Sequence, residues 1–194
     1  MLNIHTLTLG LYQTNCYIVH KIGSDHCVVI DPGYDANKIL SFLQEKDLQL
    51  DAILLTHGHF DHVGAVKDLA ADTDCKVYIN SLEHTMPHTM TAGQLYATDD
   101  YTDRFSVAGM DITALHTPGH TPGSVCLIIE DAMFSGDTLF ARSCGRTDLP
   151  GGDWATIQNS LRRLADLPRD YRVFPGHAEA TTLAQEKQLN PYMR

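Results

Sequence analysis

Short apolar runs alternate along the chain with segments of helical periodicity, and turn residues separate them. The apolar runs predict strands at residues 2–9, 15–20, 26–31, 52–55, 76–79, 105–107, 110–115, 124–129, 132–135 and 172–174. The run at 52–55 is continuously apolar, which is typical of a strand that is buried on both faces. Gly23, Ser24 and Asp25 predict a turn between the second and third strands, so the chain is expected to begin with antiparallel pairs.

Helices are predicted where apolar residues recur on one face. Residues 37–46 place Ile39, Leu40 and Leu43 on such a face, and residues 64–71 are also expected to be helical. Asp153 is a candidate N-cap for a helix whose apolar face is expected to hold Trp154, Ile157, Leu161 and Leu164. Thr182 and Gln185 have the spacing of a capping box for a final helix. Residues 81–104 are polar and weakly periodic, so the sequence does not decide whether they form a helix, a lid or both.

This order of strands and helices predicts a layered α/β fold. A length of 194 residues favours one domain, residues 1–194, and the 43% hydrophobic content is that of a folded protein. The net charge of -10 argues against a nucleic-acid partner. No apolar run is long enough to cross a membrane, and the first twenty residues contain no Lys or Arg, so we expect a cytoplasmic protein without a membrane partner.

The five cysteines do not suggest a disulfide framework or a thiolate metal site. They stand at positions 16, 27, 75, 126 and 144, an odd number with no Cys-x-x-Cys spacing. We expect all five to be small buried apolar residues.

The eleven histidines are unevenly distributed along the chain, and their positions suggest a metal site. Residues 56–62 read Thr-His-Gly-His-Phe-Asp-His directly after a predicted buried strand, and imidazole and carboxylate groups suit zinc, iron or manganese. A polar loop that happens to be rich in histidine is the alternative. Three further loops argue against it, because Pro118-Gly119-His120, Gly136-Asp137 and Pro175-Gly176-His177 also follow predicted strands. Ligands bind outside the carboxyl ends of strands in open α/β sheets, so we expect these loops to share one rim.

This set of motifs resembles the metallo-β-lactamase-fold hydrolases, and within them the glyoxalase II (hydroxyacylglutathione hydrolase) members, over residues 14–177. The resemblance implies a four-layer αββα sandwich with the metal site at the sheet rim. It implies two divalent metal ions, zinc in first place with iron or manganese as alternatives. The implied ligands are His57, His59 and His120 for one ion, Asp61, His62 and His177 for the other, and Asp137 as the bridge.

The resemblance also implies an activity, the hydrolysis of S-lactoylglutathione-like acyl-thiols by a metal-bridging hydroxide that Asp61 orients as the catalytic residue. A leaving thiolate has a pKa near 8.5 and departs without a general acid, which favours thioesters over amides. Asp137 stands where β-lactamases of this superfamily often have cysteine, which points away from antibiotic hydrolysis. Seventeen residues follow His177, so the chain resembles a small form without the helical C-terminal domain of glyoxalase II.

Several residues near these motifs have two interpretations. Arg146 and Asp148 stand where glyoxalase II relatives usually carry Lys and Tyr, and Arg146 either grips a substrate carboxylate or forms a surface salt bridge. Asp31 either orients a metal-binding imidazole or ends a strand in a turn. Arg142 and Tyr12 are weaker substrate-binding candidates, and Tyr12 is expected to pack. His84 and His88 are expected to be a solvated surface pair.

Other functions remain open on the same residues. The runner-up is a persulfide dioxygenase with a single iron, because that branch shares the His/Asp motifs and the Gly-Arg-Thr-Asp segment. Hydrolysis of another small ester or lactone is a further alternative, whereas a nuclease is disfavoured by the negative charge. A non-enzymatic metal-binding module is disfavoured by the complete set of seven ligands. The expected partner is a small-molecule acyl-thiol substrate, and the sequence does not predict an oligomeric state.

Overall fold

The computed structural model of the protein describes residues 1–95 and 97–193. Its first sheet has five strands in the order β1-β2-β3-β4-β5, with β3, β4 and β5 parallel to one another. These strands are β1 (Leu2–Leu9), β2 (Thr14–Lys21), β3 (His26–Ile30), β4 (Gln49–Leu54) and β5 (Lys76–Tyr78). The predicted antiparallel start is confirmed, because β1 pairs with β2 and β2 with β3 in antiparallel register.

The second sheet has six strands in the order β13-β12-β9-β8-β7-β6. They are β6 (Arg104–Val107), β7 (Met110–His116), β8 (Val125–Ile129), β9 (Ala132–Gly136), β12 (Arg172–Pro175) and β13 (Thr181–Thr182). A two-stranded ribbon, β10 (Leu139–Phe140) and β11 (Ser143–Cys144), follows β9. Since β12 is parallel to β9, and both β7 and β9 are antiparallel to β8, the strands β7, β9 and β12 end at the same edge.

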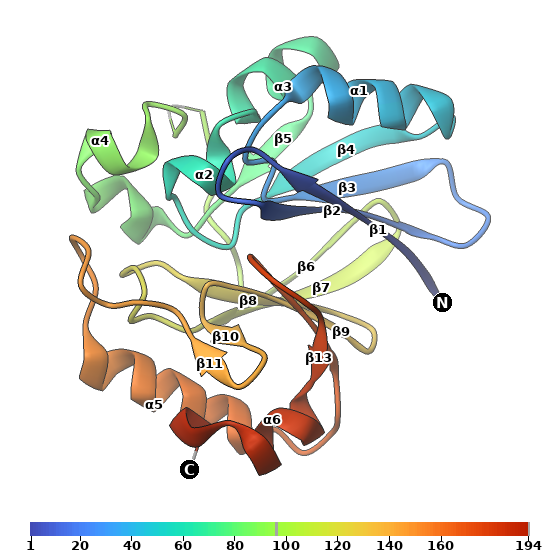
Figure 1. Ribbon diagram of the computed structural model, residues 1–194. Coiled ribbons are helices and arrows are strands. Elements are labelled where there is room, and N and C mark those ends of the chain that lie inside the picture. The colour runs from blue at the N-terminus through green and yellow to red at the C-terminus, as the bar shows by residue number, and fades with distance from the viewer. Residues whose placement is uncertain (96, 194) are drawn as a thin grey trace.

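Helices cover the outer faces of both sheets and complete the predicted four-layer αββα sandwich (Figure 1). In Figure 1, α1 and α3 lie on one side of the molecule against the first sheet, and α5 and α6 lie on the other side against the second. The helices are α1 (Ala36–Glu45), α2 (Phe60–Val63), α3 (Val66–Thr73), α4 (His88–Thr91), α5 (Trp154–Ala165) and α6 (Leu183–Leu189), with 3-10 turns η1 (Ser81–Thr85) and η2 (Pro191–Met193).

Successive side chains of a central strand point to opposite faces of the sheet, so they pack in two different cores. In β2, Cys16 and Ile18 pack in the cluster under α1 and α3, whereas Tyr17 and Val19 pack between the sheets. A third cluster lies between the second sheet and α5. Burial on both faces explains why such strands read as continuous apolar runs rather than as alternating ones.

The structure departs from the predicted elements in three places. The helix predicted at 64–71 is α3, which covers Val66–Thr73, and a short helix that was not predicted, α2, precedes it and begins inside the histidine motif. Trp154 was predicted on the buried face of α5, but it is 44% exposed and contacts Tyr192 edge-on. The unassigned residues 81–104 form η1 and α4 and then run without regular structure over most of the remaining described positions.

Both predicted helix caps are present. The carboxylate of Asp153 accepts a hydrogen bond from the N–H of Thr156 at 2.7 Å, and the Thr182 hydroxyl accepts one from the N–H of Gln185 at 3.2 Å. Within the described residues, every helix is too short or too polar to cross a lipid bilayer.

Candidate metal centre

Four loops meet at the edge where β4, β7, β9 and β12 end. Hydrogen bonds tie the two sheets together there: the carbonyl of Thr56, after β4, accepts the N–H of Val125 at 2.9 Å. The carbonyl of Gly176, after β12, accepts the N–H of Asn15 at 2.8 Å. The shared rim predicted from the motifs is therefore present, and it draws on both sheets.

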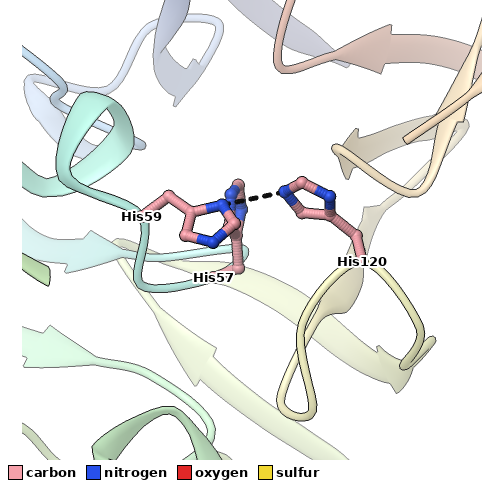
Figure 2. Close-up of side chains that lie close together, drawn as sticks. All are labelled: His57, His59 and His120. Atoms are coloured by element: carbon pink, nitrogen blue, oxygen red, sulfur yellow. Dashed lines mark hydrogen bonds between the residues drawn. The ribbon is translucent and has the colours of Figure 1, made fainter. Parts of the chain in front are cut away.

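The first group of side chains at this rim consists of His57, His59 and His120. One ring nitrogen from each lies within 4.8 Å of the others. Figure 2 shows the rings of His57 and His59, from the loop after β4, facing that of His120, which comes from a separate loop. Nδ1 of His59 lies 2.9 Å from Nε2 of His120. All three side chains are buried.

The second group consists of Asp61, His62 and His177. Asp61 and His62 lie one after the other in α2, and His177 approaches from the loop after β12. Nε2 of His177 lies 3.3 Å from Oδ2 of Asp61 and 3.3 Å from Nε2 of His62. The hydroxyl of Thr14 donates to Oδ2 of Asp61 at 3.2 Å.

Asp137 stands between the two groups. Its Oδ1 lies 3.5 Å from Nε2 of His62, and its Oδ2 lies 3.6 Å from Nε2 of His120 and 3.5 Å from Nε2 of His177. A single carboxylate therefore reaches both groups, which is the geometry that the bridging role requires. All seven predicted ligand residues lie together, and their assignment as ligands stays a prediction.

Hydrogen bonds fix the orientation of four of the five imidazoles. In each of the four, Nδ1–H donates to an oxygen: Thr56 Oγ1 for His57 at 3.1 Å, Asp31 Oδ2 for His62 at 3.0 Å, the Arg146 carbonyl for His120 at 2.7 Å and the Tyr12 carbonyl for His177 at 3.1 Å. In the neutral form of each ring, Nε2 is then the deprotonated nitrogen, and metal-binding histidines are held in this way.

Burial and the neighbouring charges lower the pKa values of His57 and His59 in the first group and raise that of His62 in the second. Burial, together with the other imidazoles, lowers the pKa of His57 well below its usual value and that of His59 to about 4. Burial also opposes the charged form of His62, but the carboxylates of Asp137, Asp31 and Asp61 outweigh it and raise the pKa to about 9. His57 and His59 are therefore neutral at pH 7 and can bind a cation without losing a proton, whereas a cation that binds His62 would displace a proton from it.

The residues fit a pair of divalent cations. Three buried polar atoms have no hydrogen-bond partner among the described residues: His57 Nε2, His59 Nε2 and Asp137 Oδ1. Unpartnered buried polar atoms are costly, and metal ions bound at the two groups would give His57 Nε2 and Asp137 Oδ1 a partner. With three residues in each group and one shared carboxylate, positions remain for water or substrate, as in catalytic rather than structural sites.

Asp31 combines both of its predicted interpretations. It ends β3 with a left-handed backbone, φ +51, and its buried carboxylate accepts the N–H of Thr56 at 2.8 Å and the hydroxyl of Thr56 at 2.6 Å. The same carboxylate accepts Nδ1–H of His62. It therefore orients one imidazole of the second group directly, and one of the first, His57, through the Thr56 hydroxyl.

Replacing Thr56 with valine is expected to weaken metal binding about 10- to 100-fold, because it removes the hydroxyl that joins His57 to Asp31 while keeping the side chain's volume. Competition with a zinc chelator measures the change. The control is Thr73→Val in α3, where the hydroxyl donates to the carbonyl of Leu69 and also hydrogen-bonds to Cys75, neither of which is a proposed ligand. Equal zinc affinity in the two variants would contradict this role for Thr56.

A pocket of about 780 Å³ opens beside the two groups. His59, Asp61, His120, Asp137 and His177 form its metal-facing side, and its other lining residues are Tyr12, Phe60, Met90, Phe140, Ser143, Cys144, Arg146 and Leu149. The packing role predicted for Tyr12 is wrong, because its side chain is 57% exposed and lies edge-on to Phe60 at the pocket. It stands in the turn between β1 and β2, which is too short to carry it into a core.

Arg146 lies in this pocket but is already paired. Its guanidinium donates to both carboxylate oxygens of Asp148 at 2.7 Å, and the hydrogen bonds from Arg146 lower the pKa of Asp148 to about 2. The salt-bridge interpretation of Arg146 is confirmed, while its contact with substrate stays a prediction. Arg142 lies 3.6 Å from Glu179 and is not among the pocket residues.

The remaining sequence candidates have structural roles or exposed positions. All five cysteines are free, and Cys16, Cys27 and Cys126 are buried as predicted. Cys75 and Cys144 are only partly buried, so the prediction is wrong for them, and Cys144 lines the pocket. His84 is exposed and bonded to the Thr98 hydroxyl at 2.8 Å. Sequence reasoning missed Thr56, Thr14 and the buried Glu83.

Comparisons with known proteins identify relatives of this chain by sequence and by fold. The family model described as the metallo-beta-lactamase superfamily matches residues 9–177. Hydroxyacylglutathione hydrolase GloC of Haemophilus influenzae is 33% identical over 209 residues, covering 99% of this chain and 98% of that protein. Two crystal structures cover nearly all of both chains. BLEG-1 B3 metallo-beta-lactamase has 34% identity and a TM-score of 0.89 (100% and 99% covered), and TTHA1623 in a di-iron-bound form has 38% identity and a TM-score of 0.87 (97% and 99% covered).

Proposed function

Because the chain belongs to the metallo-beta-lactamase superfamily of metal-dependent hydrolases, we propose that it is a thioesterase that cleaves S-lactoylglutathione-like acyl-thiols. The observation that carries the proposal is the pair of three-residue groups that Asp137 joins beside an open pocket. The relation to hydroxyacylglutathione hydrolase GloC over nearly the whole chain supports this substrate class. Zinc is the proposed metal, with iron as the alternative because a di-iron form of one relative is known.

The site residues have distinct tasks in this reaction. When bound, two divalent ions polarise the thioester carbonyl and lower the pKa of a water molecule. Asp61 orients the attacking water through a carboxylate that Thr14 and His177 hold in place. Burial would raise the pKa of Asp61, but the hydrogen bond from His177 and the charge of His62 lower it, so this carboxylate stays ionised at neutral pH.

The chemistry balances without a general acid. The water oxygen forms a bond to the carbonyl carbon, the C–S bond breaks, and its electron pair leaves with sulfur as a thiolate. The products are a carboxylate, a thiol and a proton released to solvent. A thiolate is a good enough leaving group that none of the pocket's side chains needs to protonate it.

The pocket wall favours a substrate with an apolar part and a single anionic contact. Tyr12, Phe60, Met90, Phe140 and Leu149 present apolar surface near the metal-facing side. Arg146 is the one Lys or Arg side chain among the described lining residues, and we propose that it contacts a substrate carboxylate in exchange for Asp148.

Stripping the protein of metal with a chelator is expected to abolish hydrolysis of S-lactoylglutathione, and adding zinc back to two equivalents is expected to restore it, because no residue in the pocket replaces the ions. Thiol release and elemental analysis measure the two quantities on one preparation. Three results would contradict the proposal: full activity in the metal-free protein, faster cleavage of a β-lactam than of any thioester, or one iron per chain with oxygen uptake on glutathione persulfide.

A further inference from the structure

The carboxylate of Glu83 joins the two loops that carry the first group of histidines. Glu83 lies in η1, and its side chain is completely buried. Oε2 accepts the N–H of Gly58 at 2.6 Å, and Oε1 accepts the N–H of Gly123 at 2.7 Å. Each oxygen therefore binds a different loop, although the two glycines are 65 positions apart in the sequence.

Both bonds fall next to proposed ligands. Gly58 stands between His57 and His59, and Gly123 is three residues after His120. Hydrogen bonds from backbone N–H groups to a carboxylate are charge-assisted and stronger than bonds between neutral groups. The carboxylate thus fixes the distance between the loop after β4 and the loop after β7, and with it the distance between the imidazoles that these loops carry.

The glycines themselves are adapted to this contact. A Cβ at position 123 would lie 2.7 Å from Oε1 of Glu83, and one at position 58 would lie 3.0 Å from Oε2 and 2.9 Å from Leu95 Cδ1. Any larger residue at position 123 would push the carboxylate away from the loop. The absence of a side chain at both positions lets the carboxylate reach the two N–H groups.

Burial of the Glu83 carboxylate depends on the hydrogen bonds that it accepts. Burial raises the pKa of Glu83, although hydrogen bonds from Thr121, Gly58 and Gly123 oppose the shift, so burying this carboxylate is costly. The two N–H groups of Gly58 and Gly123 are what this carboxylate satisfies, because an apolar side chain in its place would leave both donors without a partner. The same segment continues into α4 and supplies Met90 to the pocket wall, so Glu83 also fixes this wall to the metal centre.

We propose that Glu83 is a positioning residue that sets the spacing of His57, His59 and His120 and so determines the metal affinity of the first group. The inference rests on the proposed metal centre. Glu83 does not line the pocket, and its hydrogen bonds run to the backbone N–H groups of Gly58 and Gly123 and to the side chain of Thr121 rather than to a proposed ligand.

The test isolates the first group and then disrupts the two hydrogen bonds of the Glu83 carboxylate in two ways. In a His177→Ala background, which disables the second group, zinc affinity at the first group is measured by chelator competition. Glu83→Gln keeps the size of the side chain but places an amide NH₂ against one of the two N–H donors. Gly123→Ala keeps the charge of Glu83 and displaces it. Both variants are expected to weaken zinc binding about 10- to 100-fold.

Glu186→Gln is the matched control. Glu186 is also completely buried, and its carboxylate accepts the N–H of Arg142 at 2.6 Å and the Thr181 hydroxyl at 2.7 Å, away from the proposed ligands. This variant is expected to lower the melting temperature as Glu83→Gln does but to keep wild-type zinc affinity. The visible absorption bands of the Co²⁺-loaded protein are expected to shift in Glu83→Gln and Gly123→Ala and not in Glu186→Gln.

The outcomes separate this inference from the proposed function. If the wild-type protein binds no zinc, both are overturned. If it binds zinc and Glu83→Gln behaves like Glu186→Gln, the positioning role is overturned and the function stands. If only Glu83→Gln weakens binding, the charge of Glu83 acts and not its position, which also overturns the proposal. Should Glu83→Gln fail to fold, wild-type affinity in Gly123→Ala decides against the role.

Discussion

Replacing Asp137 with alanine is expected to lower metal content from two ions to less than one per chain and to reduce kcat/KM for the thioester at least about 1000-fold. The physical reason is that Asp137 lies between the groups, with Oδ1 near His62 and Oδ2 near His120 and His177. Removing it deletes a proposed ligand of both ions and leaves the positive charge uncompensated. Elemental analysis and steady-state kinetics measure the two effects.

The control for this variant is Asp131→Ala. Asp131 directly precedes β9, at the opposite end of the strand from Asp137, and its exposed carboxylate pairs with Arg172 at 2.7 Å. It is expected to keep both ions and wild-type activity. Two ions and normal kcat/KM in Asp137→Ala would rule out the bridging role.

Gly176→Ala is expected to have an effect of similar size, although glycine contributes no metal-binding atom. A Cβ at this position would lie 2.3 Å from Oδ1 of Asp137 and 2.6 Å from Cε1 of His62. One of these side chains must move away, and both belong to the proposed centre. We expect loss of metal at the second group and a fall in kcat/KM of about 1000-fold or more.

Gly23→Ala separates this steric effect from a general loss of stability. Gly23 has φ +83, so alanine there is strained by about 1–2 kcal/mol, but its Cβ would meet nothing within 4 Å. This control is expected to melt at a lower temperature and to keep two ions. Gly176→Ala is measured on its folded fraction, and wild-type zinc affinity in that fraction would show that the rim has room for a Cβ at position 176.

The sequence predicted the layers and the gathering of the metal-site residues because both depend on short-range patterns. Buried strands are recognisable as apolar runs, and each loop with proposed ligands directly follows such a run. The proposed ligands in these loops either stand next to a glycine or belong to the histidine motif at residues 56–62. Asp31 could be identified as a candidate for the same reason, since it directly follows β3 on the same rim. Position at a strand's carboxyl end is local information, and the sheet brings those ends together.

The features that the sequence could not predict depend on contacts between distant residues. Glu83 bonds to backbone N–H groups 25 and 40 residues away, and no periodicity or motif encodes such a partner. Residues 81–104 are polar and weakly periodic because much of this segment lies at the surface, so their structure follows from docking rather than from propensity. Trp154 has the spacing of the buried face of α5, but it lies at the first turn, beyond the edge of the core.

The most direct test of the account is the anomalous scattering of zinc in a crystal of the metal-loaded protein. Two peaks are expected, one among His57, His59 and His120 and one among Asp61, His62 and His177, with Asp137 in contact with both. A single peak, or peaks remote from these seven side chains, would contradict the dinuclear centre on which the proposed hydrolysis depends.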